Sequence, residues 1–436
     1  MKKAKVLITD GGGRGSVLAK KYLQSPRVGK VLAVPGNDLM KLDKNVVTFP
    51  NLKTTNIEEI IKICKKEKVD LVDVAQDDAV ASGLANRLQN LGINCIGPTK
   101  EAGRIEWDKA WSREFMKKNG LPIPRYIICK SEKEGEEFIK KSQDSKWFVK
   151  ANGLVAGKGA LFAKDNADAF EKIRQMKNFG EAGKIYLIEE YIEGEEFSSF
   201  AFVDGKDFKI VGHAQDHKTV FDGNLGPNTG GMGCSSPPLA ITKQVEKQIS
   251  GIFRKTTKKL SDLGTPYKGV LYLGGIINQN EKVYIIEFNS RWGDPEAQVL
   301  IPAIQEDLYE VSQQIARGFL RKTRITVNDL YRVVVAYSAR GYPDDYSQTT
   351  GKEIFGLDGL INSKEVTIFG AGTKVQNNKY LAVGGRLFYV MAEGKNVLET
   401  RKKVYNAMSS LYIEGNSGHY RTDIGYRDVA RFFKTI

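Results

Sequence analysis

Histidine and cysteine are scarce in this sequence. Only three histidines occur among its 436 residues, so a histidine-based catalytic triad or a three-histidine metal centre is nearly excluded by count. The four cysteines form no CxxC pair and lie far apart, which argues against a zinc site or a disulfide framework and fits a reducing cytosol. The residues concerned are His213, His217, His419, Cys64, Cys95, Cys129 and Cys234.

Long apolar runs are also missing. No stretch approaches the about 18 apolar residues that a membrane-spanning helix needs, and the N-terminus lacks the apolar core of a signal peptide. We therefore expect a cytoplasmic protein with no membrane partner. Basic residues outnumber acidic ones by 66 to 52, a formal net charge of +14. Because the lysines form short scattered pairs without an RNA-binding signature, we expect a solvated basic surface and no nucleic-acid partner.

Length and composition predict several ordinary globular domains. The chain is 41% hydrophobic and 27% charged, and its 436 residues exceed what one core normally holds. Strand and helix patterns alternate as far as Pro98, which predicts an open parallel α/β sheet within residues 1–104. A second domain is expected over residues 105–328, and a small β-rich third domain over residues 329–436.

Three further local structures are predicted from periodicity and from glycine and proline. Residues 107–119 are expected to form one helix, and residues 223–238, rich in Gly, Pro and Asn, a long loop. A helix over residues 397–409 is expected to close the third domain.

A glycine-rich loop follows the first predicted strand and reads Asp10-Gly11-Gly12-Gly13-Arg14-Gly15. Its backbone amides could hold a phosphate at a helix N-terminus. The GxGxxG spacing is absent, so dinucleotide binding is disfavoured, and a tight strand-to-helix turn is the alternative.

The most informative segment is the end of the predicted strand at residues 283–288. Glu287, Asn289 and Arg291 alternate, so they should share one face and offer a carboxylate, an amide oxygen and a guanidinium. Such a set suits Mg²⁺ and a phosphate that the metal neutralises, whereas a solvated strand edge is the alternative. The turn that follows directs Asp294 and Glu296 toward the same end of the sheet.

A second cluster suggests a nucleotide triphosphate. Lys150 ends a strand and precedes a glycine loop with a second lysine, although the Walker A pattern is absent. Glu189, Glu190 and Glu196 follow at a spacing that could reach adenine and ribose, although for this cluster by itself a solvated strand end is favoured.

In chain order, these features resemble the ATP-grasp superfamily. Within it, the motifs are similar to those of the phosphoribosylamine–glycine ligase family, and the likeness covers nearly the whole chain. The segments that carry it are Gln215-Asp216-His217-Lys218, Gly226-Pro227-Asn228-Thr229-Gly230-Gly231-Met232-Gly233, Arg291-Trp292-Gly293-Asp294-Pro295-Glu296-Ala297-Gln298, Gly341-Tyr342-Pro343, Ala371-Gly372-Thr373, Gly384-Gly385-Arg386 and Asp423-Ile424-Gly425.

The resemblance implies a fold and a reaction. It implies a Rossmann-like N-terminal domain, an ATP-grasp domain with a mobile lid at about residues 123–192, and a small C-terminal domain. The implied reaction is the ATP-driven joining of glycine to 5-phosphoribosylamine through glycyl phosphate, which gives glycinamide ribonucleotide in purine biosynthesis. Mg²⁺ or Mn²⁺ would be the metal, and a monomer or weak dimer is expected. Such phosphoryl transfer needs positioning and charge neutralisation more than acid-base residues, which suits a chain poor in histidine.

The resemblance also assigns residues to roles. The metal ligands are Glu287 and Asn289. The ATP site is Lys109, Lys150, Gly157, Lys158, Gly159, Glu189, Glu190, Ile192 and Glu196, with backbone groups of Glu190 and Ile192 reading adenine and Glu196 binding the ribose. The catalytic set is Arg291, Asp216, His217, Lys218 and Asp294, with Asp216 and Asp294 on the glycine ammonium. The remaining substrate contacts are Gly12, Gly13, Arg14, Asn228, Thr229, Gly230, Gly231, Met232 and Glu296.

Two alternatives stay open for individual parts of this assignment. His217 is either a general base for the amine or a positional hydrogen-bonding residue, and the second is favoured because an amine near its own pKa needs little help. The family's N-terminal loop usually reads Gly-Gly-Arg-Glu-His, whereas Gly15 and Ser16 follow Arg14 here, and Ala75-Gln76-Asp77 replaces Gly-Pro-Glu. These departures keep open a different amine acceptor. A non-catalytic ATP-binding relative is a separate alternative, against which the intact Glu287, Asn289, Arg291 and Lys150 argue.

Overall fold

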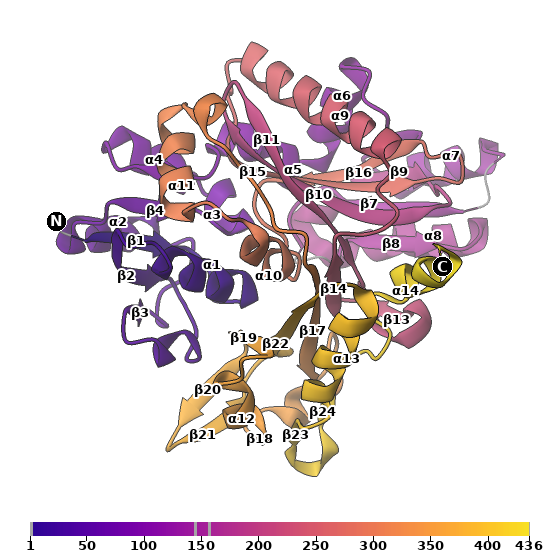
Figure 1. Cartoon of the computed structure of the whole chain (residues 1–436). Coiled ribbons are helices and arrows are strands. Elements are labelled where there is room, and N and C mark those ends of the chain that lie inside the picture. Colours follow the sequence, from indigo (N-terminus) through magenta and orange to yellow (C-terminus); the bar gives the residue numbers. More distant parts are fainter. Residues whose placement is uncertain (1–2, 144–145, 156–157, 436) are drawn as a thin grey trace.

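The computed structural model describes residues 3–143, 146–155 and 158–435. Three bodies surround a common centre: the N-terminal domain, a large central domain with a projecting small sheet, and the C-terminal domain (Figure 1). The mixed α/β architecture predicted from the sequence is confirmed. No helix in the described part of the chain combines the length and apolarity needed to cross a membrane.

The N-terminal domain is the predicted parallel sheet, with strand order β3-β2-β1-β4-β5. Adjacent residues of β1 point to opposite faces, so Val6 packs with α1 and α11 while Leu7 packs with α2 and α4. Burial on both faces explains why these strands read as continuous apolar runs. The elements are β1 (Ala4–Ile8), α1 (Gly13–Leu23), β2 (Val28–Ala33), β3 (Val46–Thr48), α2 (Ile57–Glu67), β4 (Leu71–Asp73), α3 (Asp77–Ala81), α4 (Leu84–Asn90) and β5 (Cys95–Ile96).

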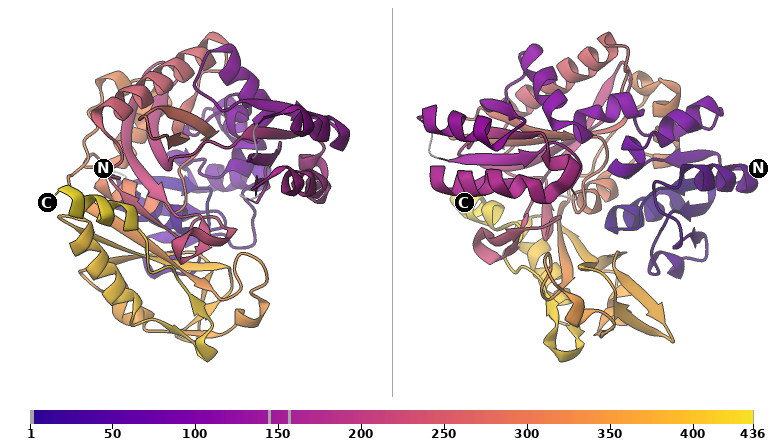
Figure 2. Two further views of the ribbon diagram at one scale, coloured as in Figure 1. Left: turned by 90° about the vertical axis from the view of Figure 1, so that its right-hand side faces the viewer. Right: turned by 180° about the vertical axis from the view of Figure 1, so that it is seen from behind.

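A helical connection leads from this domain into a small antiparallel sheet, of order β6-β9-β7-β8, that lies to one side of the molecule (Figure 2). The helix predicted over residues 107–119 is confirmed as α6, which starts two residues later because the Asp108 carboxylate accepts the Trp111 amide at 3.0 Å and caps it. The elements are α5 (Lys100–Trp107), α6 (Lys109–Lys118), β6 (Tyr126–Cys129), α7 (Glu132–Lys141), β7 (Trp147–Ala151), β8 (Ala160–Ala163), α8 (Asn166–Gln175) and β9 (Tyr186–Glu190).

One large sheet, of order β16-β15-β10-β11-β14-β17-β22-β19, runs through both the central and C-terminal domains. The central elements are β10 (Glu195–Asp204), β11 (Phe208–Asp216), β12 (Thr219–Phe221), β13 (Leu225–Asn228), β14 (Gly233–Ser236), α9 (Lys243–Asp262), β15 (Lys268–Ile277), β16 (Val283–Asn289), α10 (Ala297–Leu300) and α11 (Leu308–Arg317).

Strand β14 joins the two domains, because β11 pairs with one of its edges and β17 with the other. The predicted loop over residues 223–238 is therefore partly wrong. A Cβ at Gly233 would lie 2.6 Å from the Val334 carbonyl oxygen, so only glycine allows this close strand pairing. The composition that suggested a loop is what lets the backbones approach.

The C-terminal domain adds a second small sheet, of order β20-β21-β18-β23. The expectation that a helix near residue 409 closes the chain is wrong, because two strands and α14 follow it. The elements are β17 (Tyr331–Ala339), β18 (Glu353–Phe355), α12 (Leu357–Ile361), β19 (Val366–Gly370), β20 (Thr373–Gln376), β21 (Lys379–Ala382), β22 (Arg386–Gly394), α13 (Val397–Met408), β23 (Tyr412–Ile413), β24 (Gly418–His419) and α14 (Tyr426–Thr435).

Candidate active site

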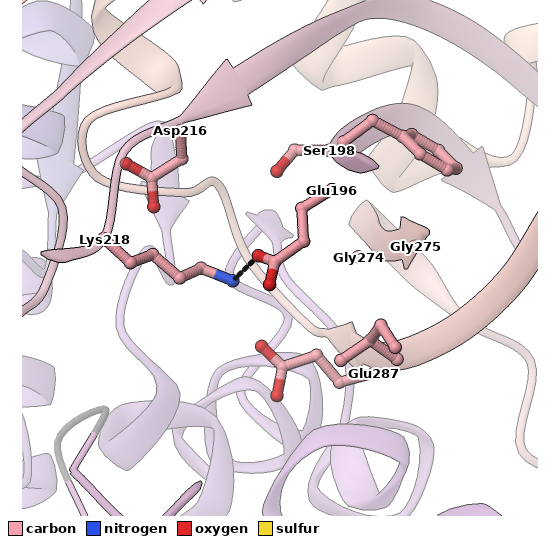
Figure 3. Close-up of a pocket in the computed structure, with 9 residues that line it drawn as sticks. Glu196, Ser198, Asp216, Lys218, Gly274, Gly275 and Glu287 are labelled. Atoms are coloured by element: carbon pink, nitrogen blue, oxygen red, sulfur yellow. Dashed lines mark hydrogen bonds and ion pairs between the residues drawn. The ribbon is translucent and has the colours of Figure 1, made fainter. Parts of the chain in front are cut away.

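A polar pocket lies among β10, β11, β15 and β16, beside the start of β10 and the end of β11. Glu196, Asp216 and Glu287 point into it, and Lys218 is the cation among its lining residues (Figure 3). The Lys218 ammonium pairs with Glu196 at 3.1 Å. Three carboxyl groups against one ammonium leave the pocket with an excess of negative charge, which favours a cationic ligand.

The triplet at the end of β16 forms a chain of contacts. The Asn289 amide donates to a Glu287 oxygen at 3.3 Å, and the Arg291 guanidinium donates to the Asn289 oxygen at 3.1 Å. Burial would raise the pKa of Glu287, but the ammonium groups of Lys218, Lys109 and Lys150 hold it below its usual range. The three side chains thus form one row, in which the Asn289 amide nitrogen faces the carboxylate and its oxygen faces the guanidinium. A carboxylate, an amide and a guanidinium are the groups that Mg²⁺ and a phosphate require.

Arg291 is held by an acid that sequence reasoning missed. Glu106, buried at the end of α5, pairs with Arg291 at 2.9 Å and accepts both the amide and the hydroxyl of Ser290. Burial would lower the pKa of Arg291, but Glu106 and then Asp77 keep it raised, so the guanidinium stays charged. No periodicity marked Glu106, because a single acid inside a helix reads as a surface residue.

Glu189 lies in a buried ion-pair cluster and reaches no open surface. It accepts two hydrogen bonds from Arg113, at 2.6 and 2.7 Å, and one from Lys150 at 2.7 Å. Burial opposes the charge, but Arg113 and Lys150 lower the pKa of Glu189 to about 2. The structure therefore gives Glu189 the task of orienting Lys150. Arg113 on α6 gave no signal in the sequence.

The other predicted nucleotide residues lie around the small sheet. The Glu190 amide donates to the Arg125 carbonyl at 3.0 Å, and the Glu190 carboxylate accepts from the Arg125 amide at 2.9 Å and from its guanidinium at 2.7 Å. Lys109 donates to the Gly153 carbonyl at 3.1 Å, and Lys158 to the Pro343 carbonyl at 3.2 Å. Two further predicted residues, Ile192 and Gly159, follow β9 and precede β8, and Gly157 lies outside the described residues.

The predicted substrate loop, residues 228–232, is held from both sides. Thr229 donates its amide and its hydroxyl to the Lys218 carbonyl, each at 2.7 Å. Arg386 of the C-terminal domain donates to the carbonyls of Gly230, at 2.6 Å, and Gly231, at 3.1 Å. Arg386 belongs to the Gly384-Gly385-Arg386 motif, for which the sequence predicted no role. Among the other loop residues, Met232 is buried and Asn228 is exposed.

The half-buried Asp216 and the buried Glu296 form an acidic pair beside this loop. Burial, reinforced by the charge of Glu296, raises the pKa of Asp216 well above its usual range. One Asp216 oxygen is buried without a partner among the described residues, whereas Glu296 accepts from Tyr272 at 2.9 Å and from Ser198 at 3.2 Å. An unpartnered buried carboxylate oxygen is the natural place for a ligand ammonium.

Asp294, predicted to act beside Asp216, has a different environment. Its carboxylate accepts from the Arg14 amide at 3.1 Å and pairs with Arg386 at 3.3 Å, with Tyr389 and Gln298 as further donors. Burial would raise the pKa of Asp294, but Arg386 and Arg14 lower it. Asp294 therefore connects the three domains and is already fully paired.

The N-terminal glycine loop is the strand-to-helix turn offered as its alternative. Arg14 is buried, and its guanidinium is taken by Asp10 and by the Trp292 carbonyl at 2.8 Å. The amides of Gly12 and Arg14 are taken by Asp10 and Asp294. The donor groups of Gly12 and Arg14 that were predicted to contact substrate are therefore already hydrogen-bonded within the protein. Gly13 packs against Gln298 and Tyr389.

The departures from the family pattern have defined partners. Ser16 donates to the Gly370 carbonyl at 2.7 Å and accepts from Asn37 at 3.0 Å, so it fastens the N-terminal domain to the end of β19. Gln76 is the N-cap of α3, and the charge of Asp77 acts on Arg291. These residues build the interface between domains.

His217 is buried and neutral. Burial, with Arg421 nearby, lowers the pKa of His217 to about 3. Its Nε2 accepts from the Gly425 amide at 3.4 Å, and its Nδ1 has no partner among the described residues. A ring that contacts the C-terminal domain in this way supports the positional role over the general base.

Comparison with known proteins gives one consistent result. Models of phosphoribosylglycinamide synthetase match the chain as an N domain over residues 4–106, an ATP-grasp (A) domain over residues 107–297 and a C domain over residues 332–427. The phosphoribosylamine–glycine ligase of Caulobacter vibrioides is 35% identical over 432 residues, which are 98% of this chain and 99% of that protein.

A longer relative and a solved structure agree. The trifunctional purine biosynthetic protein adenosine-3 of Bos taurus is 36% identical over 432 residues, or 98% of this chain, which spans 42% of that longer protein. The crystal structure of the Thermotoga maritima phosphoribosylamine–glycine ligase superposes with a TM-score of 0.82 and 30% identity, over 97% of this chain and 100% of the other.

Proposed function

The chain belongs to the phosphoribosylglycinamide synthetase family, and we propose on this basis that it joins glycine to 5-phosphoribosylamine in an ATP-driven reaction of purine biosynthesis. The products are glycinamide ribonucleotide, ADP and phosphate. The observation that carries the proposal is the hydrogen-bonded chain from Glu287 through Asn289 to Arg291, next to an acidic pocket. Such an arrangement suits phosphoryl transfer to a small cationic substrate.

The reaction proceeds in two displacements. A glycine carboxylate oxygen attacks the γ-phosphorus of ATP, the bond to ADP breaks, and glycyl phosphate forms. The nitrogen of 5-phosphoribosylamine then attacks the acyl carbon, phosphate leaves, and the nitrogen loses a proton. Arg291 stabilises the transferring phosphoryl group and the acyl phosphate, because Glu106 keeps it charged and fixed in direction.

The phosphates of ATP lie among the lysines that lower the pKa of Glu287, namely Lys150, Lys109 and Lys218. Glu189 and Arg113 fix Lys150 before the nucleotide arrives, so little ordering remains to be done on binding. Adenine contacts the backbone near Glu190 and Ile192, Lys158 and Gly159 cover the phosphates, and Glu196 binds the ribose.

Glu287 and Asn289 hold the metal, which we propose to be Mg²⁺ or Mn²⁺. Two protein oxygens suffice, because Mg²⁺ at such sites takes its other ligands from substrate phosphates and water. When bound, the metal neutralises phosphate oxygens. Asn289 would turn its amide to present its oxygen, which now accepts from Arg291.

Asp216 takes the glycine ammonium, since one of its oxygens is buried without a partner among the described residues. Glu296 adds to the negative charge there, and residues 228–232 form the floor of the pocket. Asp294 shapes the same region through Arg14 and Arg386.

Phosphate release from ATP in the presence of Mg²⁺, measured with glycine and with or without 5-phosphoribosylamine, tests the proposal. We expect amine-dependent turnover and a product with the mass of glycinamide ribonucleotide. Glycine-dependent turnover that 5-phosphoribosylamine does not stimulate would point to a different amine acceptor, and no turnover at all to a non-catalytic relative. Light scattering is expected to show a monomer or a weak dimer.

A further inference from the structure

The carboxylate of Asp10 occupies an unusual place at the start of α1. It is fully buried and accepts the amides of Gly12, at 2.6 Å, and Gly15, at 3.0 Å. Its other oxygen accepts from the Arg14 guanidinium at 2.8 Å. Because Gly12 is the N-cap and carries no side chain, this carboxylate does the capping for the helix.

Gly15 is the third residue of α1, the position from which a glutamate side chain reaches back to the N-cap amide in a capping box. That amide belongs to Gly12, and Asp10 already accepts it. A Cβ at residue 15 would lie 2.8 Å from an Asp10 carboxylate oxygen and 3.0 Å from the Asp10 Cβ. A glutamate at residue 15 and an aspartate at residue 10 therefore compete for one space and one donor.

We propose that Asp10 is a positioning residue for the ligation site, supplying from residue 10 the carboxylate that a Gly-Gly-Arg-Glu-His loop supplies from residue 15. The proposal deepens the function proposed above and rests on it. Gly15 is then the residue that makes room for Asp10, and the departure from the family pattern is an exchange of position with the charge retained.

The carboxylate acts on the site through Arg14. With Asp10 on one side, the Arg14 guanidinium donates to the Trp292 carbonyl at 2.8 Å, and the Arg14 amide donates to Asp294 at 3.1 Å. Trp292 follows Arg291 directly, so the pairing fixes the segment that carries the phosphoryl-stabilising guanidinium. Loss of the Asp10 charge leaves a buried guanidinium without its counter-ion and frees this segment to shift.

The test compares four proteins: wild type, Asp10→Gly, Gly15→Glu and the double variant. We expect each single change to lower kcat for ligation by about 100-fold, the cost of a small misplacement of catalytic groups, while the KM for ATP stays within about twofold. The double variant should recover to within about tenfold of wild type, because the new glutamate takes the vacated space. Asp10→Asn should behave like Asp10→Gly but more mildly, and Glu59→Gln, an exposed acid in the same domain, should have no effect.

Either of two results would overturn the proposal: a double variant no more active than Asp10→Gly, or an Asp10→Asn protein with wild-type kcat. If Asp10→Gly does not fold, the comparison of Asp10→Ala with and without Gly15→Glu decides, because alanine also removes the carboxylate and vacates its space. If the wild type makes no glycinamide ribonucleotide, the proposed function fails. The exchange is then still decided by the melting temperatures, since it requires the double variant to be more stable than either single variant.

Discussion

Two clusters of acids lie close together in this molecule and differ in how their charges are met. The pocket cluster, Glu196, Asp216 and Glu287 with Lys218, has more carboxyl groups than cations, and an Asp216 oxygen lacks a partner within the described residues. The hinge cluster, Asp10, Arg14, Asp294 and Arg386, pairs two carboxylates with two guanidinium groups.

From this difference we expect the pocket cluster to bind a ligand and the hinge cluster to stabilise the contact between domains. A balanced buried cluster is stable without a ligand, whereas an unbalanced one costs free energy until a cation arrives. Burial raises the pKa of Asp216, while the pKa of Asp294 is lowered by Arg386 and Arg14 despite its burial. Two aspartates that the sequence suggested as equal partners for glycine therefore have different tasks.

Glu287→Gln tests the pocket cluster most severely. Removing the charge should lower Mg²⁺-dependent ligation by about 10³-fold or more, because the phosphoryl group loses the metal that neutralises it. Stability should change little, since the side chain lies at the end of a strand. Steady-state phosphate release over a Mg²⁺ series measures the effect, with the exposed Glu246→Gln as control. A variant that kept most of its activity would remove Glu287 from the metal site.

Asp216→Asn asks whether the unpartnered oxygen is the ammonium site. We expect kcat/KM for glycine to fall by about 10- to 100-fold, the usual loss for one charged hydrogen bond, with the KM for ATP unchanged. The free energy of unfolding should be unchanged or higher, because a poorly matched buried carboxyl group is removed. Glycine saturation curves and thermal melts provide both measurements. A large loss of stability would place Asp216 in a supporting role.

Asp294→Asn should give the opposite pattern. The Arg386 guanidinium loses its counter-ion and the Arg14 amide loses a charged acceptor, so we expect a destabilisation of about 3 kcal/mol. Denaturant unfolding measures it against Asp262→Asn, an exposed acid whose single ion pair should contribute no more than about 1 kcal/mol. Should Asp294→Asn lose glycine affinity with no loss of stability, the division between the two clusters would be wrong.

The sequence predicted the residue types of the site better than their partners. Alternation brought Glu287, Asn289 and Arg291 to one face because period two is a local property of strands. Glu106 and Arg113 were missed because each becomes important only through an acid or base distant in sequence. Long-range pairing leaves no periodic signal.

For the fold as well, features that depend on local sequence patterns were predicted and features that depend on long-range pairing were missed. The parallel sheet was predicted because its strands are continuous apolar runs bounded by helices. Strand β14 was missed because its pairing with β17 depends on glycine, which local rules assign to loops. Helix α6 was predicted from its pattern, whereas α5, which the cap at Asp108 separates from it, was not.

His217 shows that an unpartnered buried atom does not always mark a ligand site, and we expect its substitution to have the smallest effect on activity. It has an unpartnered buried nitrogen, as Asp216 has an unpartnered oxygen, but burial lowers the pKa of His217 to about 3. The ring is therefore neutral over the whole working range and attracts no ion. His217→Gln should lower kcat by no more than about tenfold and leave the shape of the pH–rate profile between pH 5 and 9 unchanged. If the variant lost the acidic limb of that profile, His217 would be the general base, and an unpartnered buried atom would mark chemistry even where it carries no charge.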